Sequence, residues 1–392
     1  MNRIPPFLRW LAAGLSAVAL LTSAFVIKGQ GQRAALPASI TATAEPTTDV
    51  QHDILRLLVV ITDQHGATTG AAILARSEDS RTLRIYNIDP QSVIDLGDQG
   101  IRALSQTDQD TLIDPLQHGV QVATGIPIDA TFRLGHLTVA GLVDSVGGIK
   151  INSPKGYLVS GLEPDPIFVP EGLSTLSGKQ AAEYATFAEV GAPESDRIKR
   201  MNQILSAMFQ ALPVDAKRLN ETLESLGATA ATSAPTADVG SMLSDISTAL
   251  AWPVMAARTL PTEVSDLEQS PTSTWLRIQR TQTDPIGRAM QVSGYAAKSQ
   301  QPTVMIVGGL APDRLKLRDI LVKSGYSFVD GGNTGLDVHS GFIASKHLPH
   351  TKLEEVIAVL GFDSTWQTRA VLTDEPTADV VVTLGSDFIS PT

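Results

Sequence analysis

Three apolar segments of β-strand character open the folded part of the chain, and amphipathic helices follow them. Residues 54–62 (ILRLLVVIT) are apolar almost throughout, 70–75 (GAAILA) form a second such run, and 82–88 (TLRIYNI) alternate as a half-buried strand does. The polar residues 77–81 (SEDSR) predict a turn that joins the last two strands as a hairpin. Because strands that are followed by covering helices must bury one face of a sheet, this order predicts an α/β sandwich.

Helical spacing of apolar residues begins after these strands. One helix is predicted over residues 137–146, where a Gly-Gly pair ends it before a short strand at 149–151. Ser177 and Gln180 form a capping-box pattern, which predicts the start of a second helix. Further helices with one apolar face are predicted at 196–212, 219–226 and 239–250.

A second, smaller α/β unit is predicted from residue 302 onward. Its strands are predicted at 303–307, 326–329, 338–344 and 379–384, and its helices at 313–324 and 351–360. The order βαββαβ is the split β-α-β pattern of small two-layer domains. Gly308 and Gly309 follow the first strand, and we expect them to make a tight strand-to-helix turn. A phosphate-binding loop is not expected there, because neither GxGxxG nor GK[ST] is present.

An uncharged run from Trp10 to Ile27 precedes the folded part of the chain. It is long enough to cross a bilayer core as a helix, and Arg3 and Arg9 on its N-terminal side favour a cytoplasmic N-terminus. A cleaved signal peptide is the alternative, but the apolar run continues to its end without a small-x-small cleavage site. We therefore expect a single-pass protein of the cell membrane, with everything after Lys28 outside the cytoplasm.

Composition divides the chain into five predicted parts. They are a cytoplasmic tip with a transmembrane anchor (1–28), a flexible stalk rich in Ala, Thr, Pro and Gln (29–51), the sandwich domain (52–290), a linker (291–301) and the C-terminal domain (302–392).

Charge and residue types exclude several classes of function. The chain has 30 Lys and Arg residues against 41 Asp and Glu residues, a net charge of -11, which argues against binding of nucleic acid. The absence of cysteine excludes disulfides, thiolate nucleophiles and Cys-ligated zinc. The 7 histidines occur in no HxxxH or HExxH spacing, so no zinc site is predicted.

Three segments resemble motifs of the LytR-CpsA-Psr family. Residues 125–151 (GIPIDATFRLGHLTVAGLVDSVGGIKI) resemble its central motif, in which GI-x-ID opens a strand and VD-x-x-GG-V closes the next helix. Residues 169–184 (VPEGLSTLSGKQAAEY) resemble its G-x-x-x-L-x-G-x-x-A-L-x-Y stretch, and 195–203 (SDRIKRMNQ) its D-x-x-R-x-x-R-Q segment. The unit from residue 302 is similar to the LytR C-terminal domain.

The resemblance implies a membrane-anchored extracytoplasmic protein of bacterial envelope assembly. Members of the family transfer a glycopolymer from a polyprenyl-pyrophosphate carrier to peptidoglycan, with arginines around the pyrophosphate and a divalent ion held by aspartates. Fixed cations would stabilise the charge that builds on the leaving group. An apolar tunnel between the sheet and the helices would bury the polyprenyl chain.

The sequence departs from the family at the positions of that chemistry. Where the family has Arg-x-Asp-Thr, residues 67–70 read ATTG; where it has Ser-x-Pro-Arg-Asp, residues 87–91 read NIDPQ; and where it has Tyr-x-Arg-x-Arg, residues 184–188 read YATFA. Arg197 and Arg200 are the arginines that survive, and they are the candidate phosphate-binding residues. No catalytic residue and no resident cofactor are predicted.

Four aspartates lie near these motifs. Asp63 and Asp89 are predicted to be turn residues at strand ends rather than metal ligands. Asp129 and Asp144 match family positions at which an aspartate caps and orients elements around the central helix.

Two functions remain open, and the sequence does not decide whether the protein is an enzyme. We favour a degenerate family member that binds a polyprenyl-linked glycopolymer and acts as a scaffold beside peptidoglycan, with an intact family member as a possible partner. The alternative is an active phosphotransferase that uses unusual groups and Mg²⁺. A transcriptional attenuator is a third class, but it conflicts with the anchor and with the lack of a basic helix-turn-helix.

Overall fold

The computed structural model describes residues 55–76, 83–159, 166–227, 230–250, 257–267, 274–280, 282–283, 302–333, 340–345, 350–362, 366–370 and 378–389. The chain divides into two units, Met1–Gln51 and His52–Thr392, and all of these residues belong to the second. The predicted anchor and stalk lie outside the described residues. Within the described ranges, none of the helices has both the length and the apolar character needed to cross a membrane.

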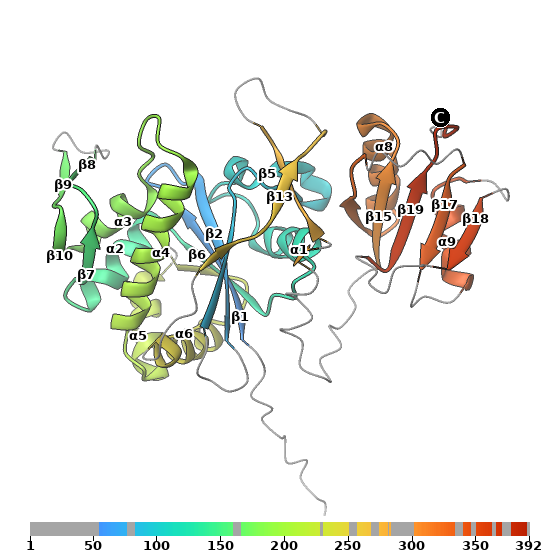
Figure 1. Ribbon diagram of the computed structural model, residues 1–392. Coiled ribbons are helices and arrows are strands. Elements are labelled where there is room, and N and C mark those ends of the chain that lie inside the picture. The colour runs from blue at the N-terminus through green and yellow to red at the C-terminus, as the bar shows by residue number, and fades with distance from the viewer. Residues whose placement is uncertain are drawn as a thin grey trace, which may run out of the picture. The chain divides into compact units, whose positions relative to one another are not determined.

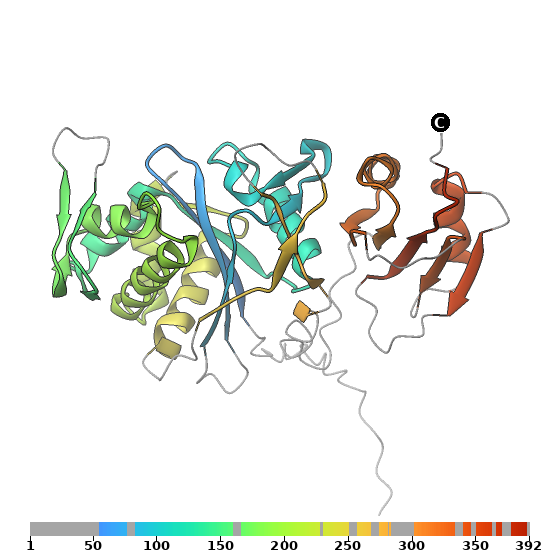
Figure 2. The same cartoon turned by 45° about the horizontal axis from the view of Figure 1, so that its top comes forward.

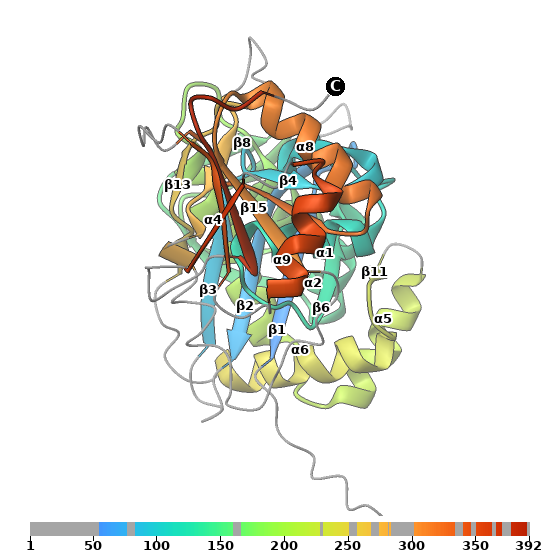
Figure 3. The same cartoon turned by 90° about the vertical axis from the view of Figure 1, so that its right-hand side faces the viewer.

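A six-stranded sheet forms the centre of the first α/β domain (Figure 1). The strand order is β11-β6-β1-β2-β3-β12, and Figure 3 shows β3, β2, β1 and β6 side by side. The strands are β1 (Arg56–Thr62), β2 (Thr68–Arg76), β3 (Leu83–Ile88), β6 (Ala130–Leu134), β11 (Ala230–Thr232) and β12 (Arg258–Thr259). The three strands predicted first are confirmed as β1, β2 and β3, and β2 pairs with β3 antiparallel as a hairpin requires. Residues 77–81, the predicted turn, lie outside the described residues.

Alternate residues of β1 enter two different hydrophobic cores. Leu57, Val59 and Ile61 belong to the core under the helices, whereas Leu58 and Val60 belong to the core on the opposite face. Since all of them are almost fully buried, the sheet is covered on both faces, which explains why its sequence is continuously apolar rather than alternating. Figure 2 shows the helices (green to yellow) on one side of the blue strands, and the cyan elements on the other.

Six helices with described bounds belong to this domain. They are α1 (Ile113–Thr124), α2 (His136–Ser145), α3 (Gly178–Thr186), α4 (Glu194–Ala211), α5 (Ala216–Leu226) and α6 (Thr236–Leu250). The five predicted helices are confirmed as α2 to α6, all of which contribute to the core under the sheet. Helix α1 was not predicted from the sequence; it packs on the other face through Leu116 and Val120, and Gly125 in the left-handed region follows its last residue.

Short two-stranded ribbons complete this domain. They are β4 (Val93–Asp95) with β5 (Ile101–Ala103), β7 (Ile149–Ser153) with β10 (Gly172–Leu176), β8 (Tyr157–Val159) with β9 (Ile167–Val169), and β13 (Thr262–Val264) with β14 (Leu276–Ile278). Two 3-10 turns, Gly97–Gln99 and Leu104–Gln106, flank β5. Of these elements, β7 is the strand that was predicted at 149–151.

The smaller α/β unit has a five-stranded sheet in the order β16-β15-β19-β17-β18. Its elements are β15 (Thr303–Gly308), α8 (Ala311–Lys323), β16 (Ser327–Asp330), β17 (Phe342–Ser345), α9 (His350–Val359), β18 (Gln367–Ala370) and β19 (Val380–Leu384). Both helices contribute to one core with the sheet, as a two-layer domain requires. The predicted order lacks β18, a four-residue strand with three polar positions that carries no apolar run. The predicted boundaries at 290 and 301 fall outside the described residues and stay predictions.

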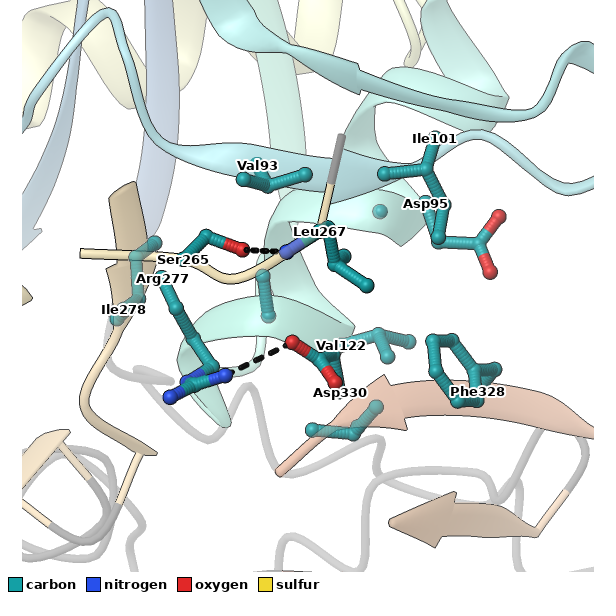
Figure 4. A pocket seen from close by; sticks show the side chains of 13 residues that line it. Val93, Asp95, Ile101, Val122, Ser265, Leu267, Arg277, Ile278, Phe328 and Asp330 are labelled. Carbon is teal, nitrogen blue, oxygen red and sulfur yellow. Dashed lines mark hydrogen bonds and ion pairs between the residues drawn. The ribbon is translucent and has the colours of Figure 1, made fainter. Parts of the chain in front are cut away.

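Ion pairs join this unit to β4 and β14 of the sandwich domain, and an apolar cluster joins it to α1. Arg318 binds Asp95 through two nitrogens at 3.0 and 2.6 Å, and Arg277 donates to Asp330 at 2.9 Å (Figure 4). Val122 of α1 lies in one apolar cluster with residues of β15 and β16. The cavity in Figure 4 measures about 40 Å³, which is room for a few water molecules and not for an organic ligand.

The capping box predicted at Ser177 is confirmed. Ser177 Oγ accepts the backbone N–H of Gln180, and the Gln180 side chain accepts the backbone N–H of Ser177 at 3.0 Å. Ser177→Ala should therefore lower the free energy of unfolding by about 1 kcal/mol, as measured by urea unfolding. Ser195→Ala, at an exposed position in the first turn of α4, is the control and should change stability by less than about 0.5 kcal/mol. Equal effects of the two substitutions would contradict the role of the cap.

Candidate functional site

The positions at which the sequence departs from the family motifs come together where α3 and α4 meet the start of β2. We call this region the α3–α4 corner. A Cβ placed on Gly70 of β2 would lie 2.5 Å from Met201 Sδ of α4, so strand and helix are in direct contact there. Arg200 of α4 reaches back to the end of α3, where it donates to the carbonyl of Tyr184 at 3.1 Å. The motifs therefore converge in space although they are far apart in the sequence.

Arg200 is buried at this corner, with 3% of its surface exposed. A second nitrogen of its guanidinium donates to the carbonyl of Phe187, and the rings of Tyr157, Tyr184 and Phe187 lie 5.2 to 5.8 Å from the guanidinium carbon. These contacts fix the side chain by hydrogen bonds and cation–π attraction. Its Nη1 is also buried, and no acceptor among the described residues contacts it.

Arg197, the other candidate, is held by an acid on its own helix. Its Nε and Nη2 lie 2.8 and 2.6 Å from Glu194 Oε1. Burial raises the pKa of the Glu194 carboxyl, an effect that Arg197 opposes and the charge of Asp89 reinforces. Arg197 and Arg200 thus lie on one helix at one corner, but their surroundings differ: Arg197 faces a carboxylate, and Arg200 faces carbonyls and aromatic rings.

The other cations of the corner are also paired with acids. Lys155 lies 2.6 Å from Glu189 and 5.2 Å from the centre of the Tyr157 ring, and the hydrogen bond to Glu189 raises the pKa of its ammonium group. Lys199 lies 2.8 Å from Asp196. Lys155 was not predicted as a member of this site, because no motif or spacing connects the loop after β7 with Glu189.

Threonines occupy two of the positions where the family has charged groups. Thr69 is buried and its hydroxyl donates to the carbonyl of Ile61 at 3.3 Å; Thr186 is buried and donates to the carbonyl of Ala182 at 3.0 Å. Each hydroxyl is thus satisfied by the local backbone, and neither supplies a charge. The corner therefore has no replacement cation or acid at these two positions.

The four aspartates have structural contacts. Asp63 accepts the backbone N–H groups of His65 and Ala67, and Asp89 accepts that of Gln91, which confirms both as turn residues. Asp129 binds the guanidinium of Arg56 at 2.8 and 3.0 Å, and Asp144 accepts the N–H of Gly178 at 2.7 Å at the start of α3. Within the described ranges, no group of three or more His, Asp or Glu side chains is placed to hold a metal ion.

The space in which a lipid tunnel was expected contains the core between the sheet and the helices. Ile61 and Leu74 of the sheet belong to one continuous buried cluster with Leu205 and Met208 of α4. A polyprenyl chain would therefore have to separate side chains that are in contact in this structure.

A family model matches the part of the chain that contains α3 and α4. The model of the LytR_cpsA_psr family matches residues 114–270, which include α2, α3 and α4 and therefore both arginines. The chain carries a LytR_cpsA_psr domain. The resemblance seen in the motifs is confirmed for this part of the chain, whereas the likeness of the C-terminal unit to a LytR C-terminal domain stays a prediction.

The solved structures to which this chain is similar have little sequence in common with it. Protein gbs0355 from Streptococcus agalactiae is 14% identical with a TM-score of 0.51, over 61% of this chain and 87% of that one. EF0465 from Enterococcus faecalis, described as a transcriptional regulator, is 15% identical with a TM-score of 0.49, over 61% and 88%. TagT bound to LIIa-WTA is 13% identical with a TM-score of 0.47, over 61% and 90%. No curated protein matched the sequence.

Proposed function

We propose that this protein is a non-catalytic member of the LytR_cpsA_psr family. It binds the phosphate end of a polyprenyl-linked glycopolymer at the α3–α4 corner, with the polyprenyl chain outside the packed core between sheet and helices, and holds it for envelope assembly without transferring it. Peptidoglycan and an intact family member are its expected neighbours. The uncharged run 10–27 anchors it in the cell membrane, and the stalk places the LytR_cpsA_psr domain outside the cytoplasm.

The pairing of the charges at the corner is the observation that carries this proposal. Phosphoryl transfer needs cations that remain free to stabilise charge on the leaving group. Here Arg197, Lys155 and Lys199 each have a carboxylate partner, and the threonines at 69 and 186 supply no charge. Arg200 is oriented by two carbonyls, and its buried Nη1 is a donor that no described residue satisfies. This arrangement supports binding of one anionic group more than it supports catalysis.

The test uses the full chain, produced in the membrane of a bacterium that makes polyprenyl-linked glycopolymers and purified in detergent. Mass spectrometry of the extracted protein should detect polyprenyl phosphate. An assay with Mg²⁺, a lipid-linked donor and a peptidoglycan acceptor should detect no transfer. Arg200→Met should reduce the retained lipid about tenfold, because the phosphate contact is lost.

Two variants control this experiment. Arg218→Met removes an exposed arginine of α5 and should leave lipid retention unchanged. Arg200→Lys keeps a cation and should retain more lipid than Arg200→Met, which separates loss of charge from loss of folding. Transfer that disappears in Arg197→Ala or Arg200→Met would instead establish an active phosphotransferase. Absence of lipid from the unmodified protein would refute the binding role.

A further inference from the structure

A cavity of about 320 Å³ lies in the smaller α/β unit, at the carboxyl ends of strands. The ends of β15 and β19 line it directly, and Asn333 lines it just after β16. The pairs β15–β16 and β15–β19 are both parallel, so three strands end at the same edge of the sheet (Figure 1). This edge is where open α/β sheets bind ligands, and the volume is at the lower end of the range for small-molecule sites.

A glycine pair shapes the floor of this cavity. Gly308 and Gly309 have φ values of 81 and 62°, which confirms the tight turn predicted between β15 and α8. A Cβ on Gly308 would lie 2.7 Å from the carbonyl oxygen of Leu384, and one on Gly309 would lie 2.7 Å from Leu384 Cδ1. Only glycine lets the turn pass this close to the end of β19, so the backbone itself forms the floor.

The charges around the cavity disfavour an anionic ligand. Asp313 is the one charged side chain among the lining residues, and it is an acid near the start of α8. Pro312 in the first turn of α8 has no N–H to offer a phosphate. Arg314 is fully buried below the turn, where it donates to the carbonyls of Gly308 and Gly309 and to the carboxylates of Asp330 and Asp266. The cavity therefore presents negative charge and no cation.

The walls combine apolar and polar groups. Leu310, Leu384 and Phe388 form the apolar part, and Leu310 is 68% exposed although it is apolar. The Phe388 ring packs edge-on against Phe362 and Trp366, with centroids 5.9 and 6.2 Å away, so its orientation is fixed. The polar part consists of the side chains of Asp313, Asn333 and Ser386, which include donors and acceptors.

We propose that this cavity binds a neutral saccharide. A sugar ring has an apolar C–H face, which suits the leucines and Phe388, and hydroxyl groups at its rim, which suit the carboxylate, amide and hydroxyl of the polar wall. A neutral ring also avoids the repulsion that Asp313 exerts on phosphates or carboxylates. The site lies outside the LytR_cpsA_psr domain and goes beyond the proposed function, on which it does not rest. It gives the C-terminal unit a glycan-binding role of its own.

The experiment measures binding to the purified full chain by calorimetry and saturation-transfer NMR. The probes are a neutral oligosaccharide of N-acetylglucosamine, maltotriose and inorganic phosphate. We expect saturable binding of at least one of the neutral oligosaccharides and none of phosphate. Phe388→Ala should weaken saccharide binding about tenfold, and Asn333→Ala should weaken it while leaving the aromatic cluster in place.

Phe168→Ala is the matched control, because Phe168 is an aromatic residue of β9 with 57% of its surface exposed. It should leave the affinity unchanged. Binding of phosphate but not of sugar, equal loss in Phe168→Ala and Phe388→Ala, or no binding of either oligosaccharide would each overturn the proposal. Lipid retention by the Phe388→Ala protein should stay at the level of the unmodified chain. Saccharide binding and lipid binding are therefore measured independently, and one proposal can be refuted without the other.

Discussion

Arg314→Met is expected to lower the free energy of unfolding by about 3 kcal/mol, one of the two largest effects that we expect from a single substitution. Arg314 is completely buried, and its guanidinium binds two carbonyl oxygens of the β15–α8 turn and Asp330 Oδ1 at 2.7 Å. Methionine fills much of the same volume but leaves both carbonyls without their donor. Arg277 still binds Asp330, which keeps the cost below that of a fully unpaired buried charge.

Urea unfolding of the full chain, followed by tryptophan fluorescence, measures this effect. Arg218→Met is the control, because it removes an exposed arginine from α5 and should change stability by less than about 0.5 kcal/mol. The double substitution Arg314→Met with Asp330→Asn should be less destabilising than the sum of the two single ones, since the remaining partner is then uncharged. Equal effects of Arg314→Met and Arg218→Met would show that the buried network does not stabilise the unit.

Elements with a strong local signal were predictable from the sequence. The run 54–62 is apolar almost throughout because β1 is covered on both faces, and Ser177 with Gln180 marks the start of α3 through local hydrogen bonds. Helix α1 was missed: it begins after Leu112 without a side-chain cap, and its buried residues include Gly119 and Thr124 along with Leu116 and Val120. Its position depends on packing against β4 and the sheet, which no local pattern records.

The sequence predicted which arginines belong to the site, but not the contacts that hold their side chains. Motif positions identified Arg197 and Arg200 on one helix. The pair of Glu194 and Arg197 is an i,i+3 contact within α4, which the sequence spacing allows. The sequence could not show that carbonyls and three rings hold Arg200, because those contacts depend on how α3 ends against α4. Lys155 shows the same limit, because its partner Glu189 lies 34 residues further along the chain and only tertiary folding brings the two side chains together.

The contact of α2 with α3 sets the position of the α3–α4 corner, and Gly178 controls that contact. An ideal Cβ at Gly178 would lie 2.0 Å from the carbonyl oxygen of Ala140 and 2.7 Å from the Asp144 carboxyl carbon. The N–H of Gly178 also donates to Asp144 at 2.7 Å, so the two helices meet through backbone and a short side chain. The first of these neighbours is backbone and cannot rotate away.

Gly178→Ala should therefore force α3 away from α2 and lower the free energy of unfolding by about 3 kcal/mol, at the upper end for an overpacked core. Because α3 supplies the carbonyl of Tyr184 that orients Arg200, lipid retention should fall with stability. Gly156→Ala is the matched control, since the nearest atom to its Cβ would be 3.5 Å away, and it should change neither. If Gly178→Ala were as stable as Gly156→Ala, α2 and α3 would not be in close contact in solution. If Gly178→Ala lost stability but retained lipid fully, the phosphate would not bind at the α3–α4 corner.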